Sequence, residues 1–243
     1  MSAGPSFLAA QLRALGVDSR RPLMVHASLR AVGPVNGGAA GVLEAIFDVL
    51  GPEGTLLMLL CADDTHPFDA QTTKVDTREM GVLAEVFRTF PEVQVNDHPA
   101  ARFAARGPLS AALLEPIPVH DYYGPGSVLE RFVAAGGQVL RLGANIDTVT
   151  VTHFAEYRAN IPNKRRVRRR YVRADTGPQM VDSLDDTDGI VDWPYGDYFS
   201  RILLDYFGED RAYVGPVGNC RAELLDAAPF VSFATQWLEQ HLQ

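Results

Sequence analysis

Hydrophobic residues recur with helical or strand-like spacing along most of the chain, and this spacing predicts an ordered series of elements. Between residues 39 and 50 the apolar side chains fall on one side of a helix, which Gly51 ends. Residues 55–60 form an almost wholly apolar run, as expected for a buried strand, and a shorter apolar run at Leu23–Val25 precedes the helix. A strand, a helix and a strand in this order predict a crossover unit with a parallel strand pair.

The same reasoning predicts the remaining elements. Helices are expected at residues 6–15, 80–90, 128–135, 198–207 and 229–242, and strands are expected at 138–142, 212–217 and 220–224, with a further short strand after residue 96. The segment after Lys164 alternates like a strand, turns at Asp175–Pro178 and resumes, which predicts a β-hairpin. No internal repeat, low-complexity tract or linker divides the sequence. We therefore expect one compact domain.

The stretch Gln138–Arg158 combines a strand, a polar turn and a helix, and it carries the first candidate chemistry. The predicted strand breaks at Gly143, and the following helix bears His153 and Glu156 three residues apart, hence on one face. A helix that starts after a strand begins at the sheet edge, where α/β folds hold their ligands. Histidine titrates near neutrality, and a neighbouring carboxylate fixes its tautomer. This spacing permits a His–Glu base, but on spacing alone a core histidine with an unrelated glutamate is the commoner explanation.

Composition and charge narrow the classes of protein. The formal net charge of -8 argues against a general nucleic-acid binder and is compatible with a cationic partner. Cys61 and Cys220 show no CxxC or Cys/His spacing, which disfavours a disulfide framework or structural zinc and favours a reducing compartment. The N-terminal segment, interrupted by Arg13, is a poor signal peptide, and no apolar run reaches membrane-span length. We expect a cytoplasmic protein that binds neither membrane nor nucleic acid.

The loop after the first predicted strand is a candidate anion site. His26, Ala27 and Ser28 leave this strand, and glycines precede the next helix, where backbone amides can hold an anion such as a pyrophosphate. Neither GxxxxGK[ST] nor GxGxxG is present, so a P-loop and a Rossmann fingerprint are both unsupported. Turn-forming glycine is the commoner reason for such a pattern.

Two acidic groups and one basic group also need interpretation. Asp63 and Asp64 precede His66 in a long loop, and further aspartates cluster at 182–188; they form either ordinary solvated loops or an acidic wall suited to a polyamine. The histidines and acids lack HExxH spacing and any compact set of three metal ligands. Residues 164–170 hold six basic residues, which we interpret as a solvated strand face paired with nearby acids rather than as a phosphate patch.

Taken together, six stretches resemble the aminoglycoside 3-N-acetyltransferase family over almost the whole chain. They are, in order, MVHASLRAVGPVNGG, GPEGTLLM, DHPAARFAARGP, GGQVLRLGANIDTVTVTHFAEYR, IPNKRR and VGPVGNCRAELLDA. The chain departs from the family pattern at Ala27, where a second serine is common, and at Arg102, where serine is frequent. The resemblance implies an α/β fold, a three-layer sandwich with a mixed, partly parallel central sheet and a β-hairpin-containing C-terminal part, in a single antibiotic N-acetyltransferase domain over residues 1–243.

The resemblance also implies an activity and assigns roles. The expected reaction moves an acetyl group from acetyl-CoA, the co-substrate, to the 3-amino group of a cationic aminoglycoside, without a metal. His153 is the expected catalytic base, which takes a proton from the attacking amine. The other implied roles are Glu156 as its companion, His26 as a second histidine at the active centre, Ser28, Leu29 and Arg30 at the CoA pyrophosphate, Phe103 and Ala104 beside the pantetheine arm, and Asp63, Asp64, Asp185 and Asp188 at the antibiotic's ammonium groups.

Two alternatives from other functional classes remain open at this point. One is a metal-dependent hydrolase built from His26, His98, His153 and the Asp63–Asp64 pair. The other is a non-catalytic protein that sequesters a polyamine and consumes no acetyl-CoA. The resemblance includes both a base and a cofactor loop, and this favours the acetyltransferase over the two alternatives. The sequence makes no prediction about the oligomeric state.

Overall fold

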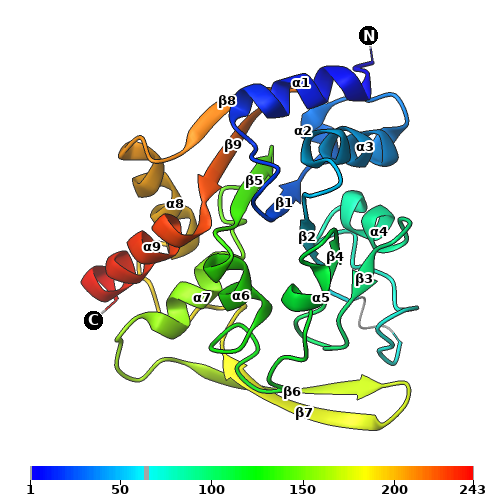
Figure 1. Ribbon diagram of the computed structural model, residues 1–243. Coiled ribbons are helices and arrows are strands. Elements are labelled where there is room, and N and C mark those ends of the chain that lie inside the picture. Colours follow the sequence, from blue (N-terminus) through cyan, green and yellow to red (C-terminus); the bar gives the residue numbers. More distant parts are fainter. Residues whose placement is uncertain (1, 63–65, 243) are drawn as a thin grey trace.

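The structure, a computed structural model, describes residues 2–62 and 66–242, and the predicted elements occur there in the expected order (Figure 1). The helices are α1 (Pro5–Leu15), α2 (Leu29–Val32), α3 (Gly38–Leu50), α4 (Val82–Arg88), α5 (Ser110–Leu113), α6 (Val128–Ala134), α7 (Val151–Arg158), α8 (Tyr198–Gly208) and α9 (Ala227–His241). The strands are β1 (Leu23–Ala27), β2 (Leu56–Leu59), β3 (Gln94–Val95), β4 (Phe103–Arg106), β5 (Gln138–Leu142), β6 (Arg166–Arg173), β7 (Gly177–Leu184), β8 (Tyr213–Val217) and β9 (Cys220–Asp226). No helix in the described part of the chain is long and apolar enough to cross a membrane.

Seven strands form one mixed sheet in the order β3-β4-β2-β1-β5-β9-β8. Strand β1 pairs in parallel with both β2 and β5, whereas the other neighbours pair antiparallel. In the β1–β5 pair, Leu23 lies opposite Gln138 and Ala27 lies opposite Leu142, so both strands end at the same sheet edge. The predicted parallel crossover unit is therefore confirmed, and the loops that follow β1, β2 and β5 emerge together.

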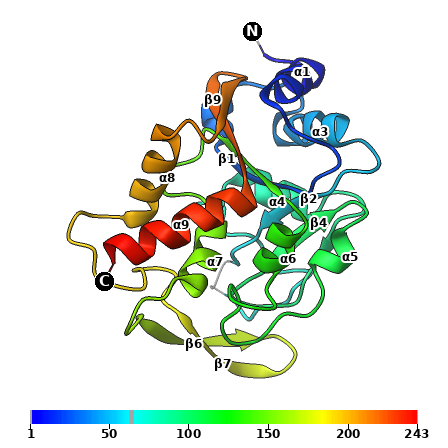
Figure 2. The ribbon, with the colours of Figure 1, turned by 60° about the vertical axis from the view of Figure 1, so that its left-hand side comes forward.

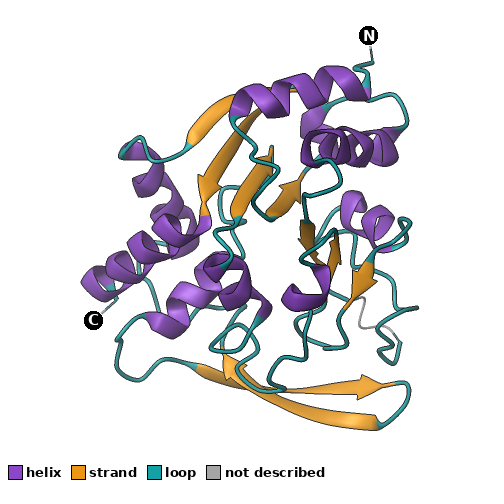
Figure 3. Cartoon of the chain, in the orientation of Figure 1, coloured by secondary structure: helices purple, strands orange, loops and turns teal. Residues whose placement is uncertain are grey.

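Helices cover both faces of this sheet, which produces three layers (Figures 1 and 3). Along β1 the side chains alternate between the faces: Leu23 and Val25 join a buried core with α1, α3 and α4, while Met24 joins a second core with α6, α7, α8 and α9. The predicted α/β fold with a mixed central sheet is confirmed. The same alternation places His26 and Met24 on the α7 side of the sheet.

The predicted hairpin is also confirmed as a separate two-stranded sheet, β6–β7, which lies below the α6 and α7 region in Figures 1 and 2. Exposure alternates along β6, as expected for a ribbon with one face against the protein. Three short elements, β3, α5 and α2, were not predicted. The segment after Ser28 is a single helical turn, α2, rather than an open loop, because the Ser28 hydroxyl accepts a hydrogen bond from the Ala31 amide and caps the turn.

Candidate active site

A cleft of about 960 Å³ opens at the sheet edge where the parallel strands end. Its walls come from the loop after β2, the loop between β5 and α7, the first turn of α7, and the segment between β7 and α8. These segments are far apart in sequence, and the parallel strand ends bring the first three of them together. The prediction that Gln138–Arg158 reaches a ligand-binding edge agrees with this geometry.

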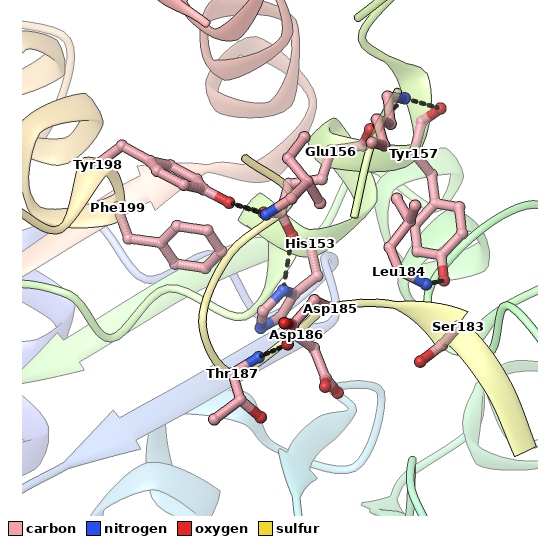
Figure 4. Close-up of polar contacts among 12 residues, drawn as sticks. His153, Glu156, Tyr157, Ser183, Leu184, Asp185, Asp186, Thr187, Tyr198 and Phe199 are labelled. Atoms are coloured by element: carbon pink, nitrogen blue, oxygen red, sulfur yellow. Dashed lines mark hydrogen bonds and ion pairs between the residues drawn. The ribbon is translucent and has the colours of Figure 1, made fainter. Parts of the chain in front are cut away.

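His153 and Glu156 form a hydrogen-bonded pair on α7 (Figure 4). Their side chains share one face of the helix, and His153 Nδ1 lies 2.8 Å from Glu156 Oε2. The Glu156 side chain is only 2% exposed, whereas that of His153 is 18% exposed and lines the cleft. A neutral ring that donates from Nδ1 to the carboxylate leaves a lone pair on Nε2. The pair is therefore arranged so that Nε2 can accept a proton.

A third side chain completes this network from a different element. The Tyr198 hydroxyl, at the start of α8, donates to Glu156 Oε1 and accepts a hydrogen bond of 2.8 Å from the Ile190 amide (Figure 4). Both carboxylate oxygens of the buried Glu156 are thus satisfied, which a buried charge requires. The segment between β7 and α8, which forms one wall of the cleft, is therefore hydrogen-bonded through Tyr198 to Glu156, the partner of His153.

The surroundings of His153 hold its ring and adjust its pKa. The Tyr123 ring stacks on the imidazole with centroids 5.0 Å apart and planes 10° apart, and the Phe199 ring contacts it at 4.9 Å and 56°. Burial among these rings lowers the pKa of His153, but the hydrogen bond and charge of Glu156, with a smaller contribution from Asp186, outweigh burial and raise that pKa above its usual value of 6.5.

His26 occupies a different environment at the end of β1. Its side chain is buried, and its Nε2 atom accepts a hydrogen bond of 3.4 Å from the Thr150 amide, just before α7. Burial, and then the neighbouring Arg141 charge, lower the pKa of His26 to about 3, so the ring is neutral at physiological pH. His26 is absent from the cleft-lining set. It contacts the start of the helix that carries His153 rather than the cleft itself.

Arg141, on β5 opposite His26, holds the β5–α7 loop in place through hydrogen bonds. Its guanidinium is 1% exposed and donates to the backbone carbonyls of Ala144, Asn145 and Thr148, while Glu223 on β9 balances its charge at 3.1 Å. Sequence reasoning missed this role because QVLRL was interpreted only as a strand. A charged residue within an apolar strand, next to the turn that leads to His153, is the signal that identifies it.

Among the residues that the structure describes, eight acidic residues besides Glu156 line the cleft. Of the four predicted substrate-binding acids, Asp63 and Asp64 lie outside the described residues, while Asp185 and Asp188 line the cleft. Asp188 is exposed, but Asp185 is 3% exposed and accepts hydrogen bonds from the Thr187 and Asp188 amides, so it orders its own loop. Asp186, a member of the acidic cluster at 182–188, also lines the cleft. Further lining acids, for which the sequence predicted no role, are Asp76, Glu79, Asp147, Asp192 and Asp197.

The residues predicted to contact CoA lie in two settings. Ser28, Leu29 and Arg30 form the turn into α2 after β1, with the Arg30 side chain exposed. Phe103 and Ala104 are fully buried on β4, where Phe103 joins the core beneath α6 and α7 and Ala104 joins the opposite core. The structure thus offers the first group to a ligand, whereas the second group supports the sheet beside the cleft.

The histidines of the metal-site alternative do not converge. His98 is buried, its Nδ1 accepts the Ala100 and Ala101 amides, and its Nε2 lies 3.1 Å from the Val119 carbonyl, so both ring nitrogens are engaged by the backbone. Across residues 2–62 and 66–242, no group of three or more His, Cys, Asp or Glu side chains is placed to hold a metal ion.

Comparison with known proteins identifies the family. Residues 24–239 match the family model for aminoglycoside 3-N-acetyltransferase. Aminoglycoside N(3)-acetyltransferase III of Serratia marcescens is 38% identical over 271 residues, 96% of each chain, and the protein of that name from Pseudomonas aeruginosa is 38% identical, with 93% of this chain and 90% of that one covered.

Solved structures agree with the sequence matches. A structure described as AAC-IIIb binary with CoASH superposes with a TM-score of 0.94 at 34% identity, covering 99% of this chain and 97% of that chain. AAC-VIa bound to sisomicin gives a TM-score of 0.92 at 35% identity with complete coverage of both chains. Together with the His–Glu pair in an acidic cleft, these matches confirm the resemblance seen in the sequence. The chain belongs to the aminoglycoside 3-N-acetyltransferase family.

Proposed function

We propose that the protein transfers the acetyl group of acetyl-CoA to the 3-amino group of an aminoglycoside, with His153 as the general base. The observation that carries this proposal is the His153–Glu156 pair, which lines a cleft together with eight further carboxylates from the described part of the chain. The relatives support the two substrates, since one is bound to CoASH and another to sisomicin.

The acidic cleft suits an aminoglycoside because the ligand carries several ammonium groups. A cleft lined by charges of one sign concentrates a ligand of the opposite sign. Asp147 comes from the β5–α7 loop, Asp76 from the long loop after β2, and Asp188 from the segment after β7, so acids surround His153 from three directions. Such an arrangement can hold several ammonium groups while one amine lies at the base.

Separate features suit the anionic co-substrate. The turn at Ser28–Arg30 presents the first amides of α2, which have no partner within the helix, and the exposed Arg30 side chain is cationic. These groups fit a pyrophosphate and lie outside the acidic cleft lining. The turn is also connected to the helix that carries the base. His26 directly precedes the turn, and its Nε2 accepts a hydrogen bond from the Thr150 amide at the start of α7.

The chemistry then follows from the residues. Acetyl-CoA supplies an activated thioester carbonyl and a sulfur leaving group. An aminoglycoside amine is mostly protonated at neutral pH, so it first releases its ammonium proton to solvent. As the neutral nitrogen attacks the carbonyl and forms the new amide bond, His153 Nε2 takes a second proton from that nitrogen. Glu156 stabilises the resulting imidazolium, and Tyr198 holds Glu156 in position. The imidazolium can return the proton to the departing sulfur as the carbon–sulfur bond breaks.

The test is thiol release from acetyl-CoA with a panel of aminoglycosides, followed by NMR of the product to locate the acetyl group. The proposal expects aminoglycoside-dependent thiol release and acetylation at the 3-amino nitrogen. Release that depends on no aminoglycoside in the panel would exclude the proposed substrate class. Acetylation at another amine would retain the enzyme class and reject the assigned position.

A further inference from the structure

Arg169 is an unexpected cation in the acidic cleft. Side chains on β6 alternate, so Arg169 and Tyr171 face inward and line the cleft, whereas Arg168 and Arg170 face outward and are exposed. Among the lining residues that the structure describes, Arg169 is the only lysine or arginine. A cation at this position reduces the attraction of the cleft for a cationic ligand.

The contacts of Arg169 show what it does in the free protein. Its guanidinium pairs with Asp186, lies 3.4 Å from Asp185 Oδ1, and donates to the Thr187 hydroxyl at 2.8 Å. Asp186 also accepts a hydrogen bond of 2.6 Å from the Tyr122 hydroxyl. Asp186, labelled in Figure 4, lies near enough to His153 for its charge to help raise the pKa of that ring. Arg169 therefore neutralises two carboxylates near the proposed base.

We propose that Arg169 is a specificity-determining residue that takes the place of one substrate ammonium group in the cleft. The inference rests on the proposed function, because it assumes a polycationic substrate. With Arg169 present, Asp185 and Asp186 already have a cationic partner, and the remaining acids select the substrate. Without that charge, the Asp186 carboxylate becomes an additional subsite for an ammonium group, whereas Asp185 keeps its two backbone amides and a second arginine, Arg165, whose Nη1 lies 3.9 Å from its Oδ2.

The side chains involved are only partly exposed, which gives the effect its expected size. The Arg169 side chain is 31% exposed, that of Asp186 is 18% exposed and that of Asp185 is 4% exposed, so water screens their charges incompletely. Replacing Arg169 by methionine keeps the length of the side chain and removes its charge. We expect sisomicin to bind the Arg169→Met variant about two- to fivefold more tightly, the scale of one partly exposed ion pair. Its affinity should also fall more steeply with added salt.

The experiment is calorimetric titration of sisomicin into the protein without acetyl-CoA, at two salt concentrations. Arg168→Met is the matched control, because Arg168 is the next residue on β6 and pairs with Asp182 on the outward face. This control should bind sisomicin like the wild type. Arg169→Lys keeps the charge and should also stay close to the wild type. Weaker or unchanged binding by a folded Arg169→Met variant would overturn the inference.

A second measurement covers the case in which Arg169→Met does not fold. The side-chain nitrogen resonances of Arg169, assigned by their loss in Arg169→Lys, should shift when sisomicin is added to wild-type protein, because the bound cation lies in the cleft that Arg169 lines. Unchanged resonances at saturation would overturn the inference. Failure of the proposed function has a different signature, since the wild type would then neither bind nor acetylate sisomicin.

Discussion

Two histidines lie near the same cleft, and their surroundings give them opposite properties. His26, at the end of β1, has Arg141 as its charged neighbour, and burial with this charge lowers its pKa to about 3. His153, on α7, has Glu156 as its neighbour, which raises its pKa above the usual value. His26 Nε2 accepts a hydrogen bond from the Thr150 amide. His153 instead contacts Glu156 through Nδ1, and its side chain lines the cleft.

The difference shows that residue type and proximity do not by themselves identify a base. The charge of the nearest partner decides whether an imidazole can exchange a proton near neutral pH. We therefore propose the base role for His153 and a positioning role for His26, which the family resemblance places at the active centre. Each prediction below tests one side of this contrast.

The largest effect is expected from His153→Ala, which removes the proposed base. Turnover should fall by about 10²–10⁴-fold, the usual contribution of a positioned general base. Steady-state thiol release measures the loss, and circular dichroism checks the fold. His120→Ala is a suitable control, because His120 is exposed and lies outside the cleft lining. Near-wild-type turnover in a folded His153→Ala variant would remove His153 from the mechanism.

A smaller effect is expected from Glu156→Gln, which keeps a hydrogen-bonding group and removes the charge. Losing a hydrogen bond to a charged group costs about 1.5–3 kcal/mol, or roughly tenfold to a hundredfold in turnover. With the carboxylate gone, burial dominates and the pKa of His153 falls.

The pH profile then distinguishes this role from a merely structural one. Because the base acts in its neutral form, the acid limb of kcat/KM follows the pKa of His153 and should lie above pH 6.5 in the wild type. In Glu156→Gln the limb should move to lower pH. A limb that stays in place while turnover drops would mean that Glu156 does not control the charge of His153.

For His26 the expected effect is on stability rather than on proton transfer. His26→Leu leaves the buried Thr150 amide without its acceptor, which should cost about 1–3 kcal/mol of unfolding free energy. His26→Gln offers an oxygen in place of Nε2 and should cost less. Urea unfolding measures both variants, and neither should move the acid limb of kcat/KM. Loss of turnover by a folded His26→Gln variant to the level of His153→Ala would restore a direct role for His26.

The smallest effect is expected at the cleft rim, far from the contrast between the two histidines. Asp188→Asn should raise the KM for the aminoglycoside by less than about fivefold with little change in kcat, because an exposed ion pair contributes little. Added salt should raise the wild-type KM in the same direction. Glu53→Gln, on the exposed turn before β2, should change neither constant. A KM indifferent to both salt and Asp188→Asn would show that this acid does not hold the substrate.

The sequence predicted the parts of the molecule that depend on local spacing. The helix and strand periods, the hairpin and the His153–Glu156 pair all arise from residues within a few positions of each other. The missed residues depend on distant contacts instead. Tyr198 reaches Glu156 across 42 positions, and Arg141 is balanced by Glu223 across 82. Strand order, with β9 beside β5, was likewise not visible in any local pattern.

The charges of loops were only partly predictable for the same reason. Asp185 looked like a free substrate-binding acid in the sequence, but the fold turns its carboxylate onto the Thr187 and Asp188 amides. No role was predicted for Asp147 or Asp192, yet the loops bring both to the cleft wall. Spacing identifies an acidic loop, whereas only the folded chain shows which carboxylates remain available to a ligand.

The most direct test of the central claim is an NMR titration of the histidine rings in the wild-type protein, with His153→Gln and His26→Gln used for assignment. We predict that His153 titrates with a pKa above 6.5 and that this transition moves to lower pH in Glu156→Gln. We predict that His26 stays neutral from pH 5 to pH 9, because its pKa is lowered to about 3. A His26 that titrates near neutrality beside a His153 that does not would contradict the assignment of His153 as the base.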